Sequence, residues 1–290
     1  MYSSDFDYYR ARSVKDAQQL LAAHPGAKLL AGGHSLVPLM KLRLAAPTAV
    51  VDIGRVAELR GISRDGDGIR IGALTTHAEL AASRELQSGA SALAQAAALV
   101  GDPTVRNRGT IGGNIAHADP ASDLPTVLVA LDARMVAAGP NGERTISATE
   151  FFTGIMTTAL ADDEILVAVH VPVSGPQQAS WYEKFSHPAS RYAVVGVAAW
   201  LAVNNGSCGA ARVAIGGLLP HARRAAAVEQ ALIGKALTDD AIRAAARQVA
   251  TDLGRDATGD IYASAEYRAA MAPVFTRRAV AAAANRATQA

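Results

Sequence analysis

The chain has 290 residues, half of them hydrophobic, and carries a formal net charge of +2 with 19% charged residues. This length is sufficient for two or three compact units, each with a core of its own. The low charge and the absence of a basic run with interleaved aromatic residues exclude an electrostatic nucleic-acid binder.

Two further features bear on location and redox chemistry. The first residues contain no apolar core of signal-peptide length, and no run of about eighteen apolar residues occurs, so we expect a cytoplasmic protein without a transmembrane segment. Cys208 is the single cysteine. It excludes an internal disulfide and any cysteine-ligated iron-sulfur cluster built from this chain only.

Residues 1–54 are predicted to form a small β-α-β-type unit. Its expected elements are a helix after Ser13, a strand at 27–31, a glycine turn at 31–35, a helix at 36–41 and a strand at 50–53. The turn follows a strand and precedes a helix. Its free N–H groups and the helix N-terminus therefore predict an anion site at the carboxyl end of the strand.

Residues 55–175 are predicted to form a second unit of short strands and Ala-rich helices. The expected strands are 59–63, 69–72, 134–138, 145–146 and 164–171, and the expected helices lie near 75–81 and 92–100. The turn formers at 173–176 indicate a linker.

Residues 176–290 are predicted to form a third, α+β unit. Strands at 193–203 and 210–218 are joined through Asn204-Asn205-Gly206-Ser207, a strong hairpin signal. Ala-rich helices are expected at 222–233, 239–253 and 264–285. An antiparallel sheet with helices is the simplest assembly.

A stretch rich in Gly, Asp, Asn and Pro, residues 101–125, is the expected centre of function. Gly101, Gly109, Gly112 and Gly113 allow positive φ and close approach of the backbone to a ligand. Successive N–H groups of residues 110–114 are predicted to form a concave nest that holds phosphate. Such a nest suits the pyrophosphate of a dinucleotide.

The motif AGGHS at 31–35, the motif TIGGN at 110–114 and Asp123 together resemble the FAD-binding medium subunit of the molybdenum hydroxylases, the carbon monoxide dehydrogenase medium-subunit and xanthine dehydrogenase FAD-domain family. The resemblance runs from Phe6-Asp7-Tyr8 through 184–188 to Arg277-Arg278. It implies an α+β chain: a two-subdomain FAD-binding fold of the PCMH type, followed by a C-terminal antiparallel sheet with helices. It also implies non-covalent FAD between the first two units.

The resemblance implies roles for individual residues. Backbone around both glycine motifs would hold the pyrophosphate, with hydroxyl donors on Ser35 and Thr110, and Asp123 would accept from a sugar hydroxyl. Lys184 would approach the pyrimidine side of the flavin, or else be a surface lysine. Tyr192 would cover the isoalloxazine, or else be an ordinary buried tyrosine. The full expected set is Leu30, Ala31, Gly32, Gly33, His34, Ser35, Leu36, Gly101, Thr110, Ile111, Gly112, Gly113, Asn114, Asp123, Leu166, Lys184 and Tyr192, with no catalytic residue.

Two other kinds of site have partial support in the sequence. His117, Asp119 and Asp123 could suggest a metal site, but Pro120 breaks any helix that would align them, and Asp119 is expected to form an Asx turn instead. The sequence Gly33-His34-Ser35-Leu36-Val37 comes close to the nucleophile elbow of a serine hydrolase built on Ser35. Its fifth position is Val, and His187 and His221 lack a convincing context as the base.

The expected function is that of an FAD-carrying electron-transfer subunit of a molybdenum-containing hydroxylase or dehydrogenase. By resemblance, a small subunit carries two two-iron two-sulfur clusters and a large subunit carries molybdopterin, in a dimer of heterotrimers. Electrons would pass from the clusters through FAD to a small-molecule acceptor. A stand-alone FAD-dependent reductase or oxidase, and a scaffold that has lost its flavin, remain as alternatives. Gly112→Val is expected to abolish flavin binding while leaving a folded protein, because valine would be held at positive φ and its side chain would occupy the place of the phosphate.

Overall fold

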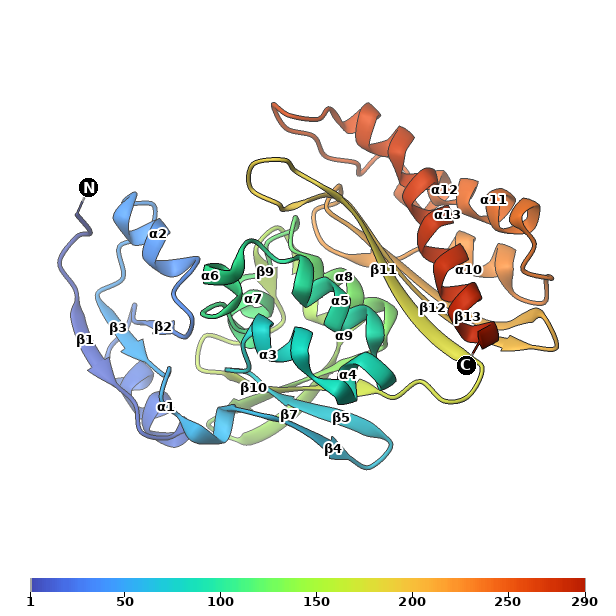
Figure 1. Cartoon of the computed structure of the whole chain (residues 1–290). Coiled ribbons are helices and arrows are strands. Elements are labelled where there is room, and N and C mark those ends of the chain that lie inside the picture. The colour runs from blue at the N-terminus through green and yellow to red at the C-terminus, as the bar shows by residue number, and fades with distance from the viewer. Residues whose placement is uncertain (1, 290) are drawn as a thin grey trace.

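The computed structural model describes residues 2–289, and its elements follow one another through three main sheets (Figure 1). A three-stranded sheet lies in the N-terminal part, a five-stranded sheet in the middle and a four-stranded sheet in the C-terminal part. Helices and strands are mixed along the whole chain, as the sequence predicts for an α+β protein.

The N-terminal part contains β1 (Asp7–Arg10), α1 (Val14–Ala23), β2 (Lys28–Leu30), α2 (Leu36–Lys41) and β3 (Ala49–Asp52). The three strands are parallel in the order β1-β3-β2. Ser13 begins α1 as predicted, because its hydroxyl accepts from the Asp16 N–H at 3.0 Å. The sequence analysis missed β1, whose four residues are mostly exposed and show no apolar alternation.

The central part begins with η1 (Ala57–Leu59), β4 (Ile62–Asp65), β5 (Gly68–Gly72), α3 (His77–Ala82), α4 (Arg84–Gly89) and α5 (Ser91–Leu99). It continues with α6 (Pro103–Arg106), α7 (Ile111–His117), α8 (Asp123–Ala130), β6 (Arg134–Gly139), β7 (Gly142–Ser147), α9 (Ala148–Phe151), β8 (Phe152–Gly154), β9 (Thr157–Thr158) and β10 (Ile165–Pro172). The five-stranded sheet is antiparallel, in the order β4-β5-β10-β6-β7. The glycine-rich stretch 101–125 therefore contains α6, α7 and the start of α8.

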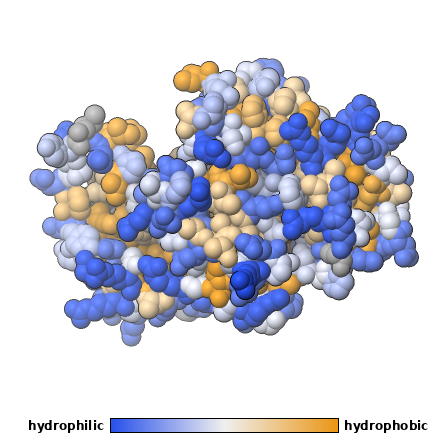
Figure 2. Space-filling view, in the orientation of Figure 1, coloured by the Kyte–Doolittle hydropathy of each residue, from blue (hydrophilic) through white to orange (hydrophobic). Residues whose placement is uncertain are grey.

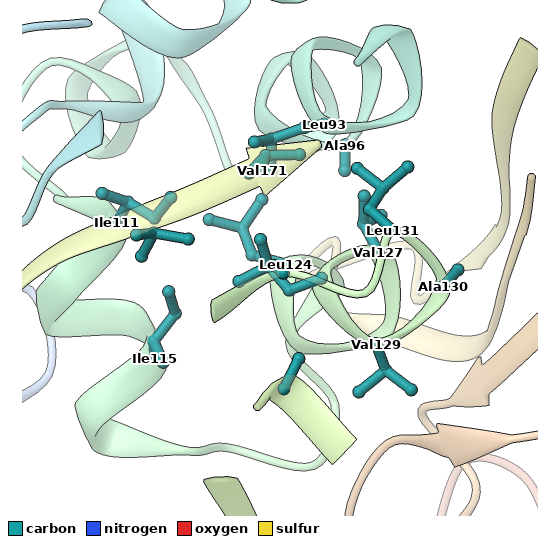
Figure 3. Close-up of a cluster of buried hydrophobic side chains, with 14 of the residues drawn as sticks. Leu93, Ala96, Ile111, Ile115, Leu124, Val127, Val129, Ala130, Leu131 and Val171 are labelled. Atoms are coloured by element: carbon teal, nitrogen blue, oxygen red, sulfur yellow. The ribbon is translucent and has the colours of Figure 1, made fainter. Parts of the chain in front are cut away.

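The core of this part lies between the sheet and its helices (Figure 3). Leu93 of α5, Ile111 and Ile115 of α7, and Leu124 of α8 are fully buried. Every residue of α8 is buried, which explains why its sequence is mostly apolar on all sides and shows no helical periodicity.

The C-terminal part contains β11 (Gln178–Ser186), β12 (Ala193–Asn204), β13 (Ser207–Gly216), β14 (Arg223–Arg224), α10 (Ala226–Leu232), α11 (Asp239–Arg247), α12 (Val249–Leu253) and α13 (Ala265–Gln289). Its strands form an antiparallel sheet in chain order. The predicted hairpin is confirmed, and Asn205 and Gly206 have the positive φ values, 49° and 77°, that its turn requires.

Both faces of this sheet are covered, so β12 is apolar along nearly its whole length. Val197 and Leu201 belong to the core formed with α10–α13, whereas Ala198 and Trp200 belong to the core of the central part. Because α5 and α8 pack on the second face, the C-terminal sheet is joined to the central part through a shared hydrophobic core.

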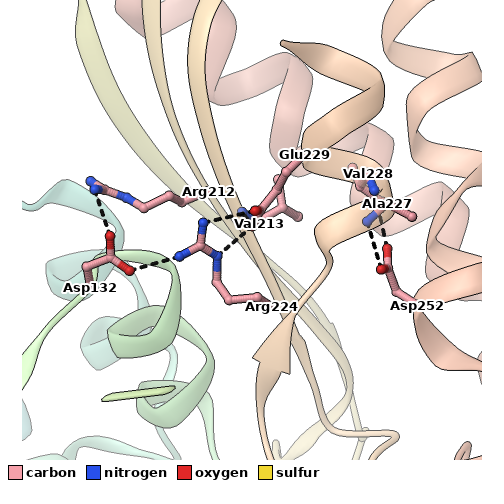
Figure 4. Close-up of polar contacts among 8 residues, drawn as sticks. All are labelled: Asp132, Arg212, Val213, Arg224, Ala227, Val228, Glu229 and Asp252. Carbon is pink, nitrogen blue, oxygen red and sulfur yellow. Dashed lines mark hydrogen bonds and ion pairs between the residues drawn. The ribbon is translucent and has the colours of Figure 1, made fainter. Parts of the chain in front are cut away.

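A polar network supports the same junction (Figure 4). The carboxylate of Asp132, just beyond α8, accepts from Arg212 at 2.9 Å and from Arg224 at 2.8 Å. The Arg224 guanidinium also bonds Glu229, and the Arg212 guanidinium lies 3.6 Å from the centre of the Trp200 ring. These contacts fasten the C-terminal end of α8 to β13 and β14.

Within residues 2–289 the structure contains no helix with the combined length and apolarity needed to cross a membrane.

Candidate cofactor-binding site

A cavity of about 690 Å³ lies between the N-terminal and central parts of the chain. In Figure 2 the surface is notched between the N-terminal part, at the left, and the rest of the molecule. The cavity is lined mainly by residues from five regions far apart in sequence, namely 27–36, 73–77, 100–117, 160–166 and 190–192, together with Ser122 and Asp123.

The turn between β2 and α2 supplies unpaired backbone donors to this cavity. Gly33 has a φ of 79°, and this left-handed residue turns the chain between the strand and the helix. The N–H groups of residues 32–36 have no hydrogen-bond acceptor in the part of the chain that the structure describes. Successive free N–H groups of this kind form a nest for an anion, as the sequence predicts for this turn.

The second glycine motif differs from the predicted nest. Thr110 is the N-cap of α7, and the N–H groups of Ile111 and Gly112 donate to Thr75 O at 2.9 Å and Ala73 O at 2.8 Å. The Gly113 N–H donates to the Thr110 hydroxyl at 3.2 Å. The prediction of a phosphate nest over residues 110–114 is therefore wrong, because these donors are already used within the protein.

The glycines of the central stretch serve mainly close packing. Among the four that were expected to allow positive φ, Gly101 adopts it, at 44°, whereas the other three do not. A Cβ on Gly112 would lie 2.5 Å from the Ala73 Cβ and 2.7 Å from the Ala73 carbonyl oxygen. The predicted reason for a Gly112→Val effect, strain at positive φ, is wrong.

We expect Gly112→Ala to destabilise the protein by about 1–3 kcal/mol, because the methyl group would force α7 away from residue 73. Urea unfolding measures this change. Gly154→Ala is the matched control, since its Cβ would meet only Thr157 side-chain atoms at 3.8 Å. Equal stability of the two variants would contradict the packing role of Gly112.

Asp123 begins α8 and is held by two buried partners. Its Oδ1 accepts from the Tyr182 hydroxyl at 2.6 Å, and its Oδ2 accepts from Lys184 Nζ at 2.7 Å. The side chains of Asp123 and Lys184 are 5% and 1% exposed. Burial raises the pKa of Asp123, and the Lys184 ammonium and the Tyr182 hydroxyl oppose part of that rise.

Lys184 thus lies behind the cavity wall. Its ammonium contacts Asp123 and the Leu99 carbonyl, at 3.4 Å, and the residue is not part of the cavity lining. The alternative of a surface lysine is wrong. Burial and the neighbouring carboxylate of Asp123 raise the pKa of Tyr182 well above its usual value, so this phenol stays protonated and donates.

Tyr192 lies in the loop between β11 and β12 and lines the cavity. It is 44% exposed, so the alternative of an ordinary buried tyrosine is wrong. The loop is braced by His187, whose Nδ1 accepts from the N–H groups of Ala189 and Ser190 at 3.2 and 3.1 Å. Arg191 has a positive φ of 59° and also lines the cavity, although the sequence analysis did not select it.

Fourteen of the seventeen predicted site residues line this one cavity, and they are Ala31, Gly32, Gly33, His34, Ser35, Leu36, Gly101, Thr110, Gly112, Gly113, Asn114, Asp123, Leu166 and Tyr192. Leu30, Ile111 and Lys184 are outside the lining. Leu30 contacts the back of the glycine turn at Gly33, and Ile111 is fully buried in the central core. Whether these residues bind FAD stays a prediction.

His77 is a cavity residue that the sequence analysis missed. It is 3% exposed, and its Nδ1 is buried without a hydrogen-bond partner. Burial lowers the pKa of His77 to about 4, with smaller contributions from His34 and Arg106. The only sequence signal was the capping motif at Thr76 and Glu79, which predicts a helix and indicates nothing about the imidazole.

We expect the low pKa of His77 to make stability pH-dependent. An unfolded histidine binds a proton below about pH 6.5, whereas folded His77 stays neutral down to about pH 4. His77 therefore does not lower the free energy of unfolding above pH 6.5. As the pH drops from 6.5 to 4, its protonation in the unfolded state lowers the free energy of unfolding by up to about 3 kcal/mol. Urea unfolding at pH 7 and pH 4.5 should show a smaller pH effect in His77→Phe than in the wild type. The same pH effect in both proteins would contradict this assignment.

The structure does not support the two other kinds of site. Asp119 Oδ1 accepts from the Ala121 N–H at 2.9 Å, which confirms the predicted Asx turn. Among the described residues there is no group of three or more His, Cys, Asp or Glu arranged to hold a metal ion. Within residues 2–289 no hydrogen bond joins Ser35 to a histidine or a carboxylate, and His187 is engaged with its own loop.

Comparison with known proteins agrees with this architecture. Residues 4–174 match the family model described as FAD binding domain in molybdopterin dehydrogenase, and residues 180–283 match the CO dehydrogenase flavoprotein C-terminal domain. The chain is 41% identical over 282 residues to the carbon monoxide dehydrogenase medium chain of Hydrogenophaga pseudoflava, covering 96% of each chain. It is 38% identical to the 6-hydroxypseudooxynicotine dehydrogenase complex subunit alpha of Paenarthrobacter nicotinovorans, covering 99% of this chain and 97% of that one.

Solved structures show the same fold. A chain of carbon monoxide dehydrogenase from Hydrogenophaga pseudoflava superposes with a TM-score of 0.94 at 42% identity, and a chain of quinoline 2-oxidoreductase from Pseudomonas putida 86 with a TM-score of 0.93 at 33% identity. Each comparison covers 99% of both chains. The α+β fold class and the family resemblance predicted from the sequence are confirmed. The chain belongs to the FAD-binding medium subunits of the molybdenum hydroxylase family.

Proposed function

We propose that this chain carries FAD in the cavity between its N-terminal and central parts and acts as the electron-transfer subunit of a molybdenum-containing hydroxylase or dehydrogenase. It accepts electrons from iron-sulfur clusters of a partner and passes them to a small-molecule acceptor. The observation that carries this proposal is the row of free N–H groups at residues 32–36, all of which belong to residues that line a cavity of about 690 Å³.

The residues present fit FAD. The nest at residues 32–36 suits a pyrophosphate, because N–H groups without protein acceptors stabilise phosphate charge without a lysine. The hydroxyls of Ser35 and Thr110 lie on the cavity wall as further donors. Leu166 and Tyr192, also on the wall, provide apolar and aromatic surface for a flavin ring. Bound FAD supplies a carrier that takes up and releases electrons.

The cysteine content of the chain indicates that the iron-sulfur clusters are held by a different subunit. An iron-sulfur cluster requires several thiolate ligands, whereas this chain has only Cys208, which is 1% exposed. The clusters therefore belong to another chain. We propose a small iron-sulfur subunit and a large molybdenum subunit, assembled with this chain as a dimer of heterotrimers, in line with the family resemblance.

The purified chain is expected to carry FAD that acid precipitation releases into the supernatant, because hydrogen bonds to backbone N–H groups hold phosphate reversibly. A flavin spectrum before precipitation and free FAD afterwards are the measurements. A colourless protein that cannot take up added FAD would sink the cofactor assignment.

The electron-transfer role is tested by separating the two half-reactions. The chain is expressed alone and together with the subunits encoded beside it, and substrate-dependent dye reduction is compared. We expect dithionite to bleach the flavin of the lone chain and an acceptor to restore it, whereas only the complex oxidises a hydroxylase substrate. Substrate turnover by the lone chain would favour the alternative of a stand-alone flavin reductase or oxidase.

A further inference from the structure

His77 lies beside residues 108–109, which also pack against Gly32 of the first glycine motif. Its backbone N–H donates to Gly109 O at 3.0 Å, and a Cβ on Gly109 would lie 2.8 Å from the ring atom Cδ2 and 3.0 Å from Nε2. The same segment packs against the glycine turn, since a Cβ on Gly32 would lie 2.2 Å from the Arg108 carbonyl oxygen and 3.0 Å from the Gly109 Cα. Residues 108–109 thus contact both the imidazole and the Gly32 turn, and His77 and residues 32–36 line the same cavity.

The ring nitrogens of His77 differ in their surroundings. Nδ1 is buried without a partner, and the residue contributes to the cavity wall. A buried N–H without an acceptor is rarer in proteins than a buried acceptor without a donor, so the proton belongs on Nε2. Nε2 is then the nitrogen that can meet a group in the cavity, and Nδ1 carries the unused lone pair.

The ring is also fixed in place and uncharged. Thr76 and Glu79 form a capping box around the first turn of α3, which begins at His77. Burial keeps the pKa of His77 near 4, and smaller contributions from His34 and Arg106 act in the same direction. At neutral pH the His77 ring is therefore uncharged and held in one position, and its Nε2–H has no acceptor in the part of the protein that the structure describes.

We propose that His77 is a cofactor-binding residue, which donates its Nε2–H to a phosphate oxygen of the FAD pyrophosphate held by the nest at residues 32–36. This inference rests on the proposed function. Donation from a neutral imidazole requires no proton uptake at His77, so this contact forms without a change in the protonation of the ring. The ring thereby extends the row of backbone donors with a side-chain donor from α3.

The test compares two substitutions in the flavin-free protein by titration with FAD and with riboflavin, which lacks phosphate. His77→Phe keeps the volume of the ring and removes the donor, whereas His77→Gln keeps an N–H group near the position of Nε2. We expect FAD affinity to fall about 10- to 100-fold in His77→Phe, since a hydrogen bond to a charged group is lost. His77→Gln should remain within about threefold of the wild type, and riboflavin affinity should not change in either variant.

The controls distinguish a hydrogen-bonding role of His77 from a role in packing alone. They also distinguish a failure of this inference from a failure of the proposed function. His221→Phe, a half-buried histidine outside the cavity, should bind FAD as the wild type does. FAD affinity of His77→Phe equal to the wild type, or an equal loss of riboflavin affinity, would show that His77 only fills space. If the wild-type protein binds no FAD, the proposed function itself is contradicted.

A second measurement observes the imidazole in the wild-type protein and uses a variant only to assign the signals. Nitrogen-15 NMR of histidine-labelled wild-type protein, with the His77 signals assigned from their loss in His77→Gln, reports the tautomer directly. We expect the neutral Nε2–H form between pH 6 and 8, with and without FAD, and a shift of the Nε2 signal when FAD binds. An Nδ1–H tautomer or a protonated ring in the FAD-bound protein would overturn the inference, as would an unchanged Nε2 signal.

Discussion

Gly32→Ala is expected to lower FAD affinity by at least about tenfold and to destabilise the protein by about 1–3 kcal/mol. The added methyl group would lie 2.2 Å from the Arg108 carbonyl oxygen and 3.0 Å from the Gly109 Cα. Both neighbours are backbone atoms, so no side chain can rotate away to make room. The turn at 31–36 must then move away from residues 108–109, and the free N–H groups move with it.

Titration of the flavin-free variant with FAD and thermal unfolding measure the two effects. The matched control is Gly175→Ala, whose Cβ would meet only atoms of the Gln178 side chain, at 3.8 Å and beyond. Circular dichroism distinguishes local displacement from global unfolding. If Gly32→Ala binds FAD as tightly as the control, the contact between the two glycine motifs has no part in shaping the cofactor site.

Lys184→Met is expected to destabilise the protein by about 3–5 kcal/mol, because it leaves the buried carboxylate of Asp123 without its counter-charge. The loss of the ammonium should also raise the pKa of Asp123 further, because the Lys184 charge opposes the effect of burial. Urea unfolding at pH 7 measures the cost. Lys15→Met, at an exposed position of α1, should change stability by less than about 0.5 kcal/mol.

A double-mutant cycle isolates the ion pair from the loss of packing. Asp123→Asn combined with Lys184→Met should be less destabilising than the sum of the two single changes, because neither buried charge is then left alone. Additive effects would show that the pair is not coupled in solution. The Asp123→Asn variant also reports whether FAD requires this carboxylate.

The features that could be predicted from the sequence were local ones. A turn such as Asn205-Gly206 depends on the φ values that a few neighbouring residues can adopt, and the turn at Gly33 is of the same kind. The helix cap at Ser13 likewise involves a partner three residues away. Because the chemistry of each feature is complete within one short segment, its residue types are sufficient to predict it.

The features that could not be predicted depend on contacts between distant segments. The N–H groups of Ile111 and Gly112 seemed available for phosphate, and only the approach of Ala73 and Thr75 shows that they are used. The side chain of Lys184 is placed by a carboxylate that lies 61 residues away in sequence. A lone histidine such as His77 carries no pattern, since its burial and its unpartnered nitrogen arise only when α3 packs against the central stretch.

The attachment of α8 at both of its ends has a consequence for building hybrid proteins. Asp123 at its start is paired with Lys184 of β11, and Asp132 beyond its end is paired with Arg212 and Arg224. A chimera that takes residues 1–175 from this chain and the remainder from a relative would keep both carboxylates. The relative would have to supply cations at the positions of Lys184, Arg212 and Arg224. Hybrids are therefore expected to be stable only when these partners are exchanged together, so an exchange of chain segments at residues 173–176 would not exchange independent modules.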